Sequence, residues 1–324
     1  MKFETNDLIG TKVVVTGGSG FLGSFVVEKL RMEKAAQIFV PRRNTYDLTQ
    51  RAAVAQLYAD VEPDIVIHLA ATVGGIGANQ SNPGLFFYEN MMMGLHVIDE
   101  ARRYGRLKKL VFVGTACSYP RDTATPFQEE DLWNGYPEET NAPYGIAKKS
   151  LLVMLQGYRQ QYQLAGIYLI PANLYGPRDN FDEKTSHVIP ALIRRFVGAQ
   201  QNRLPHVTVW GTGEVSREFL YVEDAAEGIL LATKYYTGIE PVNLGNGIEI
   251  RIKDLVKEVA SLAEYIGDIQ WDSSRPDGQP RRKLSVERAL RDFGFRAQTD
   301  LQAGLRKTLA WYLGTPKGVA QEAG

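Results

Sequence analysis

The stretch KVVVTGGSGFLG, residues 12–23, decides how the rest of the chain is interpreted. An apolar, β-branched run leads into glycines at positions 17, 20 and 23, and the residues that follow have helical spacing. Such glycines allow a tight turn, close approach of a pyrophosphate to the backbone and close packing of helix on sheet. An ordinary glycine-rich turn is the alternative, but a position after the first strand favours a dinucleotide site. Its expected residues are Gly17, Gly18, Ser19, Gly20, Phe21, Leu22 and Gly23.

Similar strand signals recur at residues 37–40, 64–71 and 108–114, with helical patterns between them. Nearly uninterrupted Val, Ile, Leu and Phe runs, in place of alternating ones, are typical of strands covered on both faces. A helix over about 144–162 and a strand over 165–173 continue the alternation. The sequence therefore predicts an α/β fold with a Rossmann-type, doubly wound parallel sheet.

Beyond Gly176 the pattern changes, because polar, proline-bearing segments separate shorter elements. This mixture predicts a smaller, discontinuous substrate lobe. The segment 218–236 has the pattern of a strand followed by a helix, and we expect it to return to the first domain. The predicted division is a dinucleotide-binding domain at 1–178 and 217–245 and a substrate lobe at 179–216 and 246–324.

Charge and cysteine content argue against several classes of protein. Thirty-seven basic residues balance thirty-seven acidic ones, so the overall positive field that nucleic acids or anionic membranes select is missing. The first ten residues lack the apolar region of a signal peptide, and no stretch reaches the roughly 18 apolar residues that a membrane span needs. One cysteine permits no intrachain disulfide and no cysteine-based metal cluster. We expect a soluble, cytoplasmic protein without a metal, a nucleic-acid partner or membrane association.

The end of the second predicted strand bears on which dinucleotide is bound. An acidic residue there would hydrogen-bond the ribose hydroxyls of NAD, whereas arginine accommodates a 2′-phosphate. The chain has Arg42 and Arg43 at this point, directly after Pro41. They could be ordinary surface charges, but two guanidiniums favour NADP(H) as the cofactor.

Lys148 follows Tyr144 by four positions near the start of a predicted helix, which places both side chains on one face. A phenol is a poor acid–base group at neutral pH unless a nearby cation stabilises its phenolate. The pair therefore suits proton transfer to a carbonyl or alcohol oxygen. A solvated lysine beside a packed tyrosine is the alternative. The glycine loop upstream and the hydroxyl of Thr115 at a strand end between them favour the chemical interpretation.

Several longer segments of the sequence resemble those of a known protein family. The segments HLAATVGGIGAN (68–79), NLYGPRDNF (173–181), SHVIPALIRRF (186–196), VWGTG (209–213) and PDGQPRRK (276–283) resemble extended short-chain dehydrogenases/reductases, and more narrowly the GDP-L-fucose synthase family. That family converts GDP-4-keto-6-deoxy-D-mannose by 3,5-epimerisation and 4-reduction. The resemblance covers nearly the whole chain and implies a nucleotide-sugar substrate and a homodimer packed through two long helices.

The resemblance also assigns roles. It implies a reductase triad of Thr115, Tyr144 and Lys148, with threonine where serine is commoner, and an epimerisation acid/base pair of Cys117 and His187. A lone cysteine is most often a small buried hydrophobe, which is the alternative for Cys117. His68 is expected to hold a nearby loop by hydrogen bonding and not to catalyse.

The last group of expected site residues binds the substrate and the cofactor. The resemblance points to a substrate site formed by Asn173, Arg195, Trp210, Arg217, Asp277 and, as a weaker candidate, Arg282, with surface salt bridging as the alternative for the charged ones. The remaining residues expected at the cofactor are Asp47, Leu48, Leu69, Ala70, Ala71, Lys148, Pro171, Asn173, Leu174 and His187.

Three other functions stay open at this point. The same chemistry could act on another GDP-4-keto-sugar, a dideoxyhexose or a heptose. A nucleotide-sugar 4-epimerase would hold NAD tightly and release no oxidised cofactor; Arg42 and the pairing of Cys117 with His187 argue against it. An inactive dinucleotide-sensing protein would not need Thr115, Tyr144 and Lys148.

Overall fold

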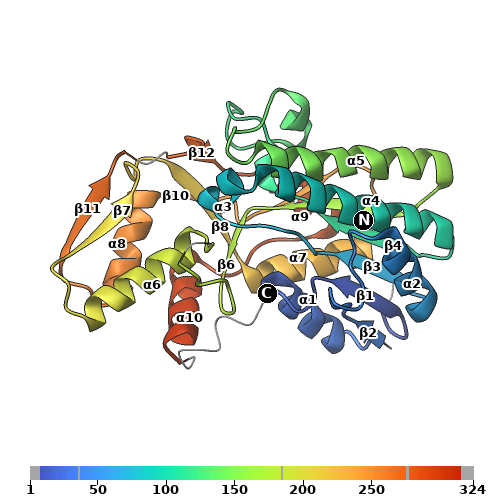
Figure 1. The fold of residues 1–324 in the computed structure, drawn as a ribbon, viewed down its shortest axis with the longest axis horizontal. Helices are drawn as coiled ribbons and strands as arrows, with labels where there is room; N and C mark the ends of the chain where they lie inside the picture. The colour runs from blue at the N-terminus through green and yellow to red at the C-terminus, as the bar shows by residue number, and fades with distance from the viewer. Residues whose placement is uncertain (1–7, 36, 184, 275–276, 315–324) are drawn as a thin grey trace.

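The computed structural model of the chain describes residues 8–35, 37–183, 185–274 and 277–314 (Figure 1). Its larger sheet has six parallel strands in the order β2-β1-β3-β4-β5-β9. The strands are β1 (Lys12–Thr16), β2 (Gln37–Phe39), β3 (Ile65–His68), β4 (Lys109–Val113), β5 (Gly166–Pro171) and β9 (Val242–Leu244). This order, which runs outward from β1 in both directions, confirms the predicted doubly wound sheet.

Helices cover both faces of this sheet, as the continuous apolar strands require. In Figure 1 the long helices α4 and α5 lie along one side, and α1 and α7 lie along the other. The helices around this sheet are α1 (Phe21–Met32), α2 (Arg51–Val61), α3 (Ile76–Ser81), α4 (Pro83–Tyr104), α5 (Ala142–Tyr162), α7 (Val222–Tyr235) and α9 (Glu287–Phe293). Every residue of β3 and β4 is buried, so the central strands form the middle of the core.

The predicted strand at 165–173 is interrupted in the structure. Its first part is β5, and after Ala172 the chain enters β6 (Asn173–Tyr175), which pairs with a strand of a different sheet. Ala172 itself still donates its N–H to the carbonyl of Leu244, at the end of the large sheet. This crossing directs Asn173 and Leu174 away from the first sheet and toward the smaller lobe.

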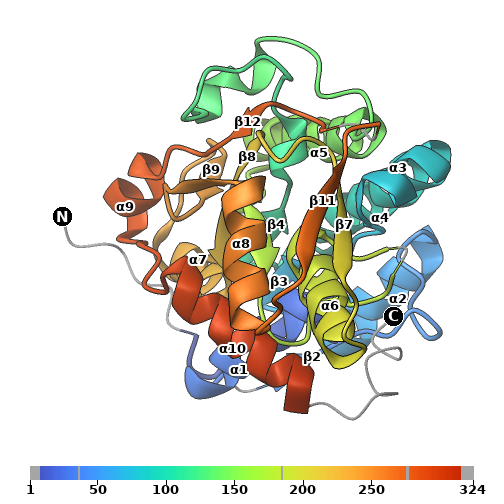
Figure 2. The ribbon, with the colours of Figure 1, turned by 90° about the vertical axis from the view of Figure 1, so that its left-hand side faces the viewer.

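The smaller lobe has a hydrophobic core of its own. Strand β8 (Ser216–Tyr221) pairs with β6, β10 (Glu249–Arg251) and β12 (Arg281–Arg282), and β7 (His206–Trp210) pairs with β11 (Asp268–Asp272). Figure 2 shows the helices of this lobe beside these strands. They are α6 (Val188–Gln201), α8 (Ile252–Leu262) and α10 (Leu301–Gly314).

Two details differ from the expected division of the chain. Strand β8 lies in the smaller sheet, so the return to the first domain is made by α7 and β9 and not by the whole segment 217–245. Leu284, Phe293 and Phe295 belong to the core of the large sheet, although the expected lobe included them. Residues 1–7 and 315–324 of the two expected domains lie outside the described residues.

Buried carboxylates tie these elements together. Glu218 on β8 is almost fully buried and accepts backbone N–H groups of Asn246 (2.6 Å), Gly247 (2.7 Å) and Leu284 (2.6 Å). Burial raises the pKa of Glu218, and the three N–H donors act in the opposite direction. This carboxylate joins β8 to the connection that follows β9 and to the residue after β12.

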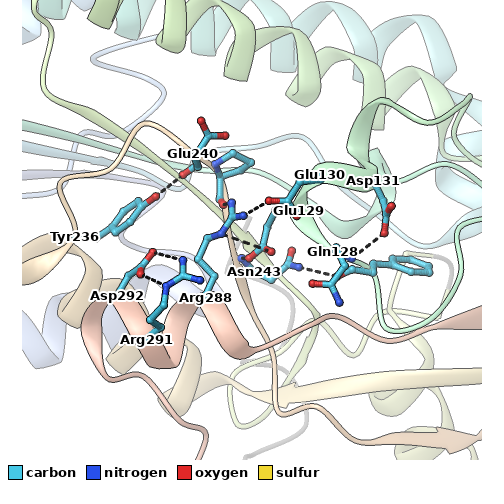
Figure 3. Close-up of polar contacts among 12 residues, drawn as sticks. Gln128, Glu129, Glu130, Asp131, Tyr236, Glu240, Asn243, Arg288, Arg291 and Asp292 are labelled. Atoms are coloured by element: carbon cyan, nitrogen blue, oxygen red, sulfur yellow. Dashed lines mark hydrogen bonds and ion pairs between the residues drawn. The ribbon is translucent and has the colours of Figure 1, made fainter.

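A second junction holds the segment between β4 and α5 (Figure 3). Glu129, in the short 3₁₀ helix η2 (Glu129–Trp133), accepts the N–H of Asn243 at 3.0 Å, and Asn243 accepts the hydroxyl of Tyr119 at 2.8 Å. Arg288 on α9 lies 3.8 Å from Glu129 and also bonds Glu130. The loop after β4 is therefore anchored to β9, at the edge of the sheet.

No helix among the described residues is long and apolar enough to span a bilayer.

Candidate active site

The glycine loop between β1 and α1 leaves no space for side chains at two of its positions. Gly17 has φ +69°, and a Cβ on it would stand 2.8 Å from the backbone nitrogen of Ala70. A Cβ on Gly23 would stand 2.0 Å from the carbonyl oxygen of Gly17. Gly20 directly precedes α1, so the first N–H groups of that helix point toward the loop. The loop is therefore a backbone-lined cradle at the positive end of a helix, which fits a dinucleotide pyrophosphate.

His68, at the end of β3, contacts Thr16, the last residue of β1 before the glycine loop. Its Nδ1 lies 2.8 Å from the hydroxyl oxygen of Thr16, which in turn accepts the N–H of Ala70 at 3.3 Å. His68 is fully buried, and burial, followed by the charge of Lys148, lowers its pKa well below the usual value. The imidazole is therefore neutral and holds the loop of Leu69, Ala70 and Ala71 against β1, as expected from the sequence.

The two arginines after β2 have different surroundings. Arg42 is exposed, and its guanidinium forms no hydrogen bond or ion pair with any residue that the structure describes. Arg43 donates to Glu89 on α4 at 2.9 Å. Asp47 accepts both the N–H and the hydroxyl of Thr49, and these hydrogen bonds lower its pKa. Leu48 is buried beside them. Arg42 is thus the arginine that is available for a phosphate.

Thr115 and Cys117 occupy one short 3₁₀ turn, η1 (Ala116–Ser118), directly after β4. The hydroxyl of Thr115 caps this turn by accepting the N–H of Cys117 at 3.1 Å. The hydroxyl of Ser118 donates to the carbonyl of Gly145 on α5 at 2.9 Å. The turn is therefore fastened to the first turn of the helix that carries Tyr144, and Cys117 is half-buried there.

Tyr144 and Lys148 follow on α5. Burial raises the pKa of Tyr144 and a hydrogen bond with Thr115 acts in the opposite direction, so the phenol stays protonated at neutral pH. Lys148 is buried and donates to the carbonyl of Val113 at 3.2 Å, with its Nζ 5.1 Å from the centre of the Phe112 ring. Burial lowers the pKa of Lys148 to about 7. The site thus contains a protonated phenol and, four positions later on α5, a lysine that can change charge near neutral pH.

Two arginines from the smaller sheet reach the same place. The Nη1 of Arg282 lies 3.5 Å from the sulfur of Cys117. Arg217 on β8 donates to the carbonyls of Ser216 (2.7 Å) and Asp277 (3.1 Å). Burial, followed by the charge of Arg282, lowers the pKa of Arg217 to about 9, with Cys117 acting in the opposite direction. The thiol therefore faces two guanidinium groups, those of Arg217 and Arg282, which are called the arginine wall.

The carboxylate of Asp277 is already bonded within the smaller lobe. It accepts the N–H of Thr212 at 2.8 Å and the Thr212 hydroxyl at 2.7 Å. Trp210, at the end of β7, has 58% of its surface exposed. Arg195 on α6 donates to the carbonyl of Thr208 at 2.7 Å, and burial lowers its pKa. These side chains lie on the smaller lobe without a direct bond to Cys117 among the described contacts.

His187 lies at the N-terminal end of α6 and is solvent-accessible. The protein around it still lowers its pKa, because partial desolvation disfavours the charged imidazolium. The loop that precedes it meets the loop after β3, where Gly75 donates its N–H to the carbonyl of Thr185 at 3.3 Å. Thr185, two residues before His187, therefore lies against the loop after β3, whereas no contact among the described residues joins the His187 side chain to Cys117 or Tyr144. On β6, Asn173 donates to the carbonyl of Glu218 at 3.1 Å, beside Pro171 and Leu174.

Sequence reasoning missed three supporting residues. Gly145 allows α5 to contact η1, Tyr168 on β5 donates to the carbonyl of Lys148 at 2.9 Å, and Gln279 accepts from Arg282 at 3.1 Å. Gln279 stands within PDGQPRRK, and Gly145 directly follows Tyr144 in the sequence. Nothing in the sequence around Tyr168 distinguishes it from an ordinary apolar strand residue.

This arrangement can carry acid–base chemistry on a carbonyl compound. The residues around the turn after β4 supply a hydroxyl, a phenol and a thiol, and the carboxyl edge of the sheet lies beside the glycine cradle. Ligands of open α/β sheets bind at this edge, where the strand order reverses. Guanidiniums at the opposite wall suit an anionic substrate.

Comparison with known proteins agrees with this geometry. The sequence profile described as the NAD dependent epimerase/dehydratase family matches residues 13–245. The GDP-L-fucose synthase of Sinorhizobium fredii is 41% identical, over 93% of this chain and 95% of that protein. The GDP-L-colitose synthase of Yersinia pseudotuberculosis is 33% identical, over 93% of this chain and 98% of that protein.

Among solved structures, a GDP-L-fucose synthetase from Naegleria fowleri superposes with a TM-score of 0.86 at 28% identity, covering 96% of this chain and 95% of that one. The Naegleria fowleri enzyme has also been solved bound to NADP. The similarity extends over both lobes. The chain therefore belongs to the NAD dependent epimerase/dehydratase family, within the group of sequences that contains the GDP-L-fucose synthases.

Proposed function

We propose that the protein converts GDP-4-keto-6-deoxy-D-mannose to GDP-L-fucose by 3,5-epimerisation followed by NADPH-dependent 4-reduction. The observation that carries this proposal is the convergence of Thr115, Cys117 and Tyr144 at the end of β4, with the arginine wall opposite. The names of the relatives at about 40% identity support the choice of substrate.

NADP(H) fits the residues on the cofactor side. The cradle at Gly17 and Gly23 admits backbone approach only, and Arg42 offers a guanidinium for a 2′-phosphate. When bound, NADPH would supply the hydride that the reduction needs. The contribution of this chain is to hold the cofactor at the edge where Tyr144 and Lys148 lie.

Epimerisation follows from the acidity of the sugar. A ketone at C4 acidifies the hydrogens on C3 and C5, because each carbanion is an enolate with its charge on O4. Cys117 and His187 would act as the acid/base pair: one removes the proton, its electron pair moves onto O4, and the other returns a proton on the opposite face. Hydrogen bonds from Thr115 and Tyr144 to O4 would stabilise that charge.

Reduction uses the same oxygen. Addition of hydride to C4 places negative charge on O4, which then takes a proton from the phenol of Tyr144. The raised pKa of Tyr144 suits this direction, because the group begins protonated as a proton donor must. Lys148, four positions later on α5 and with a pKa of about 7, would stabilise the phenolate left behind when the lysine is charged.

The nucleotide end of the substrate would occupy the smaller lobe. Arg217 and Arg195 suit a diphosphate, Trp210 offers an indole face to a base or ribose, and Asp277 can accept hydrogen bonds from hydroxyls. We propose that the lobes divide the work, with the cofactor on the large sheet and the nucleotide-sugar on the small one. Arg282 has a different set of contacts, with Gln279 and the sulfur of Cys117.

Oligomerisation would use the outer faces of α4 and α5. Leu85, Tyr88 and Leu95 on α4 and Val153 on α5 are exposed apolar residues on two adjacent helices. We propose a cytoplasmic homodimer that buries them. Replacing Leu95 and Val153 together by glutamate should give a monomer in light scattering, and an unchanged mass would contradict this interface.

The test is incubation with GDP-4-keto-6-deoxy-D-mannose and NADPH in D₂O, with cofactor absorbance and product stereochemistry followed together. We expect NADPH oxidation, deuterium at C3 and C5 and a fucose product. Cys117→Ser should slow deuterium entry but still reduce a pre-epimerised 4-ketosugar. Equal loss of both activities would contradict the division of labour.

Each alternative gives a different outcome. The similarity to a GDP-L-colitose synthase favours a dideoxy substrate as the second candidate, and a higher kcat/KM with the 3-deoxy sugar would select it. A higher kcat/KM with a GDP-4-keto-heptose would select a heptose substrate instead. Sugar inversion at C4 without net NADPH oxidation would indicate a nucleotide-sugar 4-epimerase.

A further inference from the structure

Arg282 is the charged group in direct contact with the only thiol of the chain. Its Nη1 lies 3.5 Å from the sulfur of Cys117, across 165 positions of sequence. A neutral thiol is a weak hydrogen-bond acceptor, whereas a thiolate accepts strongly from a guanidinium, which remains protonated in proteins. The contact would therefore strengthen whenever the sulfur carries negative charge.

The guanidinium is buried and fixed in place. Only 8% of Arg282 is exposed, and its Nε donates to the side-chain oxygen of Gln279 at 3.1 Å. Gln279 is itself buried and donates to the carbonyls of Pro120 (3.1 Å) and Arg121 (2.8 Å). These carbonyls belong to the loop that follows Cys117. The chain of hydrogen bonds thus positions Arg282 by means of the same loop that carries the thiol.

A buried positive charge requires compensation. Within the described residues, no carboxylate lies at ion-pair distance from Arg282; Glu138 acts on it only through longer-range attraction. The neighbouring Arg217 is a like charge and makes the local potential more positive. The sulfur of Cys117 is the group best placed to carry the compensating negative charge.

The adjacent residue provides the contrast. Arg281 precedes Arg282 on β12 and, because successive side chains of a strand point to opposite faces, it lies on the other side. It pairs with Glu249, with Nε and Oε2 3.2 Å apart, and is largely exposed. One arginine of the pair is thus neutralised by a carboxylate, and the other faces the thiol.

We propose that Arg282 is a positioning residue that holds the sulfur of Cys117 and stabilises negative charge on it when Cys117 acts as the base that removes a proton from the sugar. Its importance for epimerisation rests on the proposed function. The groups that face the thiol are Tyr144 from α5, Arg217 from β8 and Arg282 from β12, with Glu138 facing the arginines. Of these, only Arg282 touches the sulfur within the described contacts.

Alkylation of the purified enzyme by iodoacetamide tests this without any sugar or cofactor. Because the chain has one cysteine, mass spectrometry of the intact protein reports Cys117 alone. We expect Arg282→Gln to slow alkylation at pH 7 by about three- to tenfold and to move the rate–pH curve to higher pH, since the thiolate is the reactive form. Arg282→Lys should restore part of the rate. Arg281→Gln, the matched control, should behave as wild type.

A second variant avoids dependence on one substitution. Gln279→Ala keeps the positive charge of Arg282 but removes the hydrogen bond that fixes its guanidinium. Alkylation should therefore slow by a smaller factor than in Arg282→Gln. The same rate–pH curve in wild type, Arg282→Gln and Gln279→Ala, all folded by circular dichroism, would overturn the proposal. A raised KM for the nucleotide-sugar with unchanged alkylation would also overturn it and make Arg282 a substrate ligand.

Failure of the proposed function gives a different result. If Arg282→Gln slows alkylation but Cys117→Ser keeps full deuterium exchange at C3 and C5, the thiolate contact stands and the catalytic role of Cys117 does not. The two claims therefore have separate measurements.

Discussion

Gly145 on α5 lies directly against the carbonyl oxygen of Cys117: a Cβ on this glycine would stand 2.4 Å from that oxygen. The obstructing atom is backbone, in a turn fastened to α5 by the hydrogen bond from Ser118 to Gly145. The first turn of α5 and the thiol-bearing turn therefore have no freedom to separate or to accept a larger residue between them.

We predict that Gly145→Ala lowers both stability and epimerisation, because the added methyl group must displace η1. Deuterium exchange at C3 and C5 should fall at least tenfold, and the melting temperature should drop. Gly157→Ala is the control, since nothing lies within 4 Å of a Cβ at that position of the same helix. It should be neutral or slightly stabilising, by up to about 1 kcal/mol. Equal behaviour of the two variants would contradict the packing argument.

Tyr144→Phe should depress reduction, because it removes the proton donor for O4 and leaves the fold intact. A loss of about 10² to 10⁴ in the rate of NADPH oxidation is expected for a missing general acid. Tyr158→Phe on the same helix, whose hydroxyl bonds Asp99 on α4 at 3.1 Å, should keep full activity. Undiminished turnover in Tyr144→Phe would remove this residue from the chemistry.

The glycine loop and the parallel sheet could be predicted from the sequence because each depends on local features, namely glycine spacing and continuous apolar runs. The gathering of Thr115, Cys117 and Tyr144 could also be anticipated, since a strand end and the start of a later helix meet at one edge of such a sheet. Their catalytic roles remain predictions until activity is measured.

Local sequence patterns do not specify which distant segments a strand or a side chain contacts in the fold. Residues 165–173 have one apolar pattern, yet Asn173 pairs with β8 and Leu169 with β4, because strand propensity does not specify which sheet a strand joins. The expected role of Arg282 in substrate binding stays a prediction, but the sequence pattern does not indicate its contact with Cys117. Its burial and its contact with Cys117 arise from folding of the smaller sheet onto the loop after β4.

Cofactor preference should depend on Arg42 more than on Arg43. Arg42→Ala should raise the KM for NADPH about tenfold and leave that for NADH nearly unchanged, because only NADPH carries the 2′-phosphate. Arg43→Ala should have a smaller effect, since its guanidinium already pairs with Glu89. Steady-state kinetics with both cofactors provide the measurement, and equal effects on NADPH and NADH would contradict a phosphate contact at Arg42.

Burying the charged Lys148 side chain, which the proposed chemistry requires, lowers the free energy of unfolding. Burial lowers its pKa from 10.5 to about 7, so the folded protein holds the proton less tightly than the unfolded chain. Below pH 7 both states are protonated, and the folded state bears the full cost of a buried ammonium. Between pH 7 and about 10.5 the folded protein is neutral at this position while the unfolded chain stays charged, so the cost declines as pH rises.

We therefore predict that Lys148→Met abolishes reduction but raises the melting temperature at pH 6 by roughly 2 °C or more, because methionine fills the site without a charge. The gain should shrink at pH 9. Lys253→Met is the control: Lys253 pairs with Glu214 at the surface of the smaller lobe, and its loss should change the melting temperature little and equally at both pH values. A Lys148→Met protein that is less stable than wild type at pH 6 would show that the ammonium stabilises the fold.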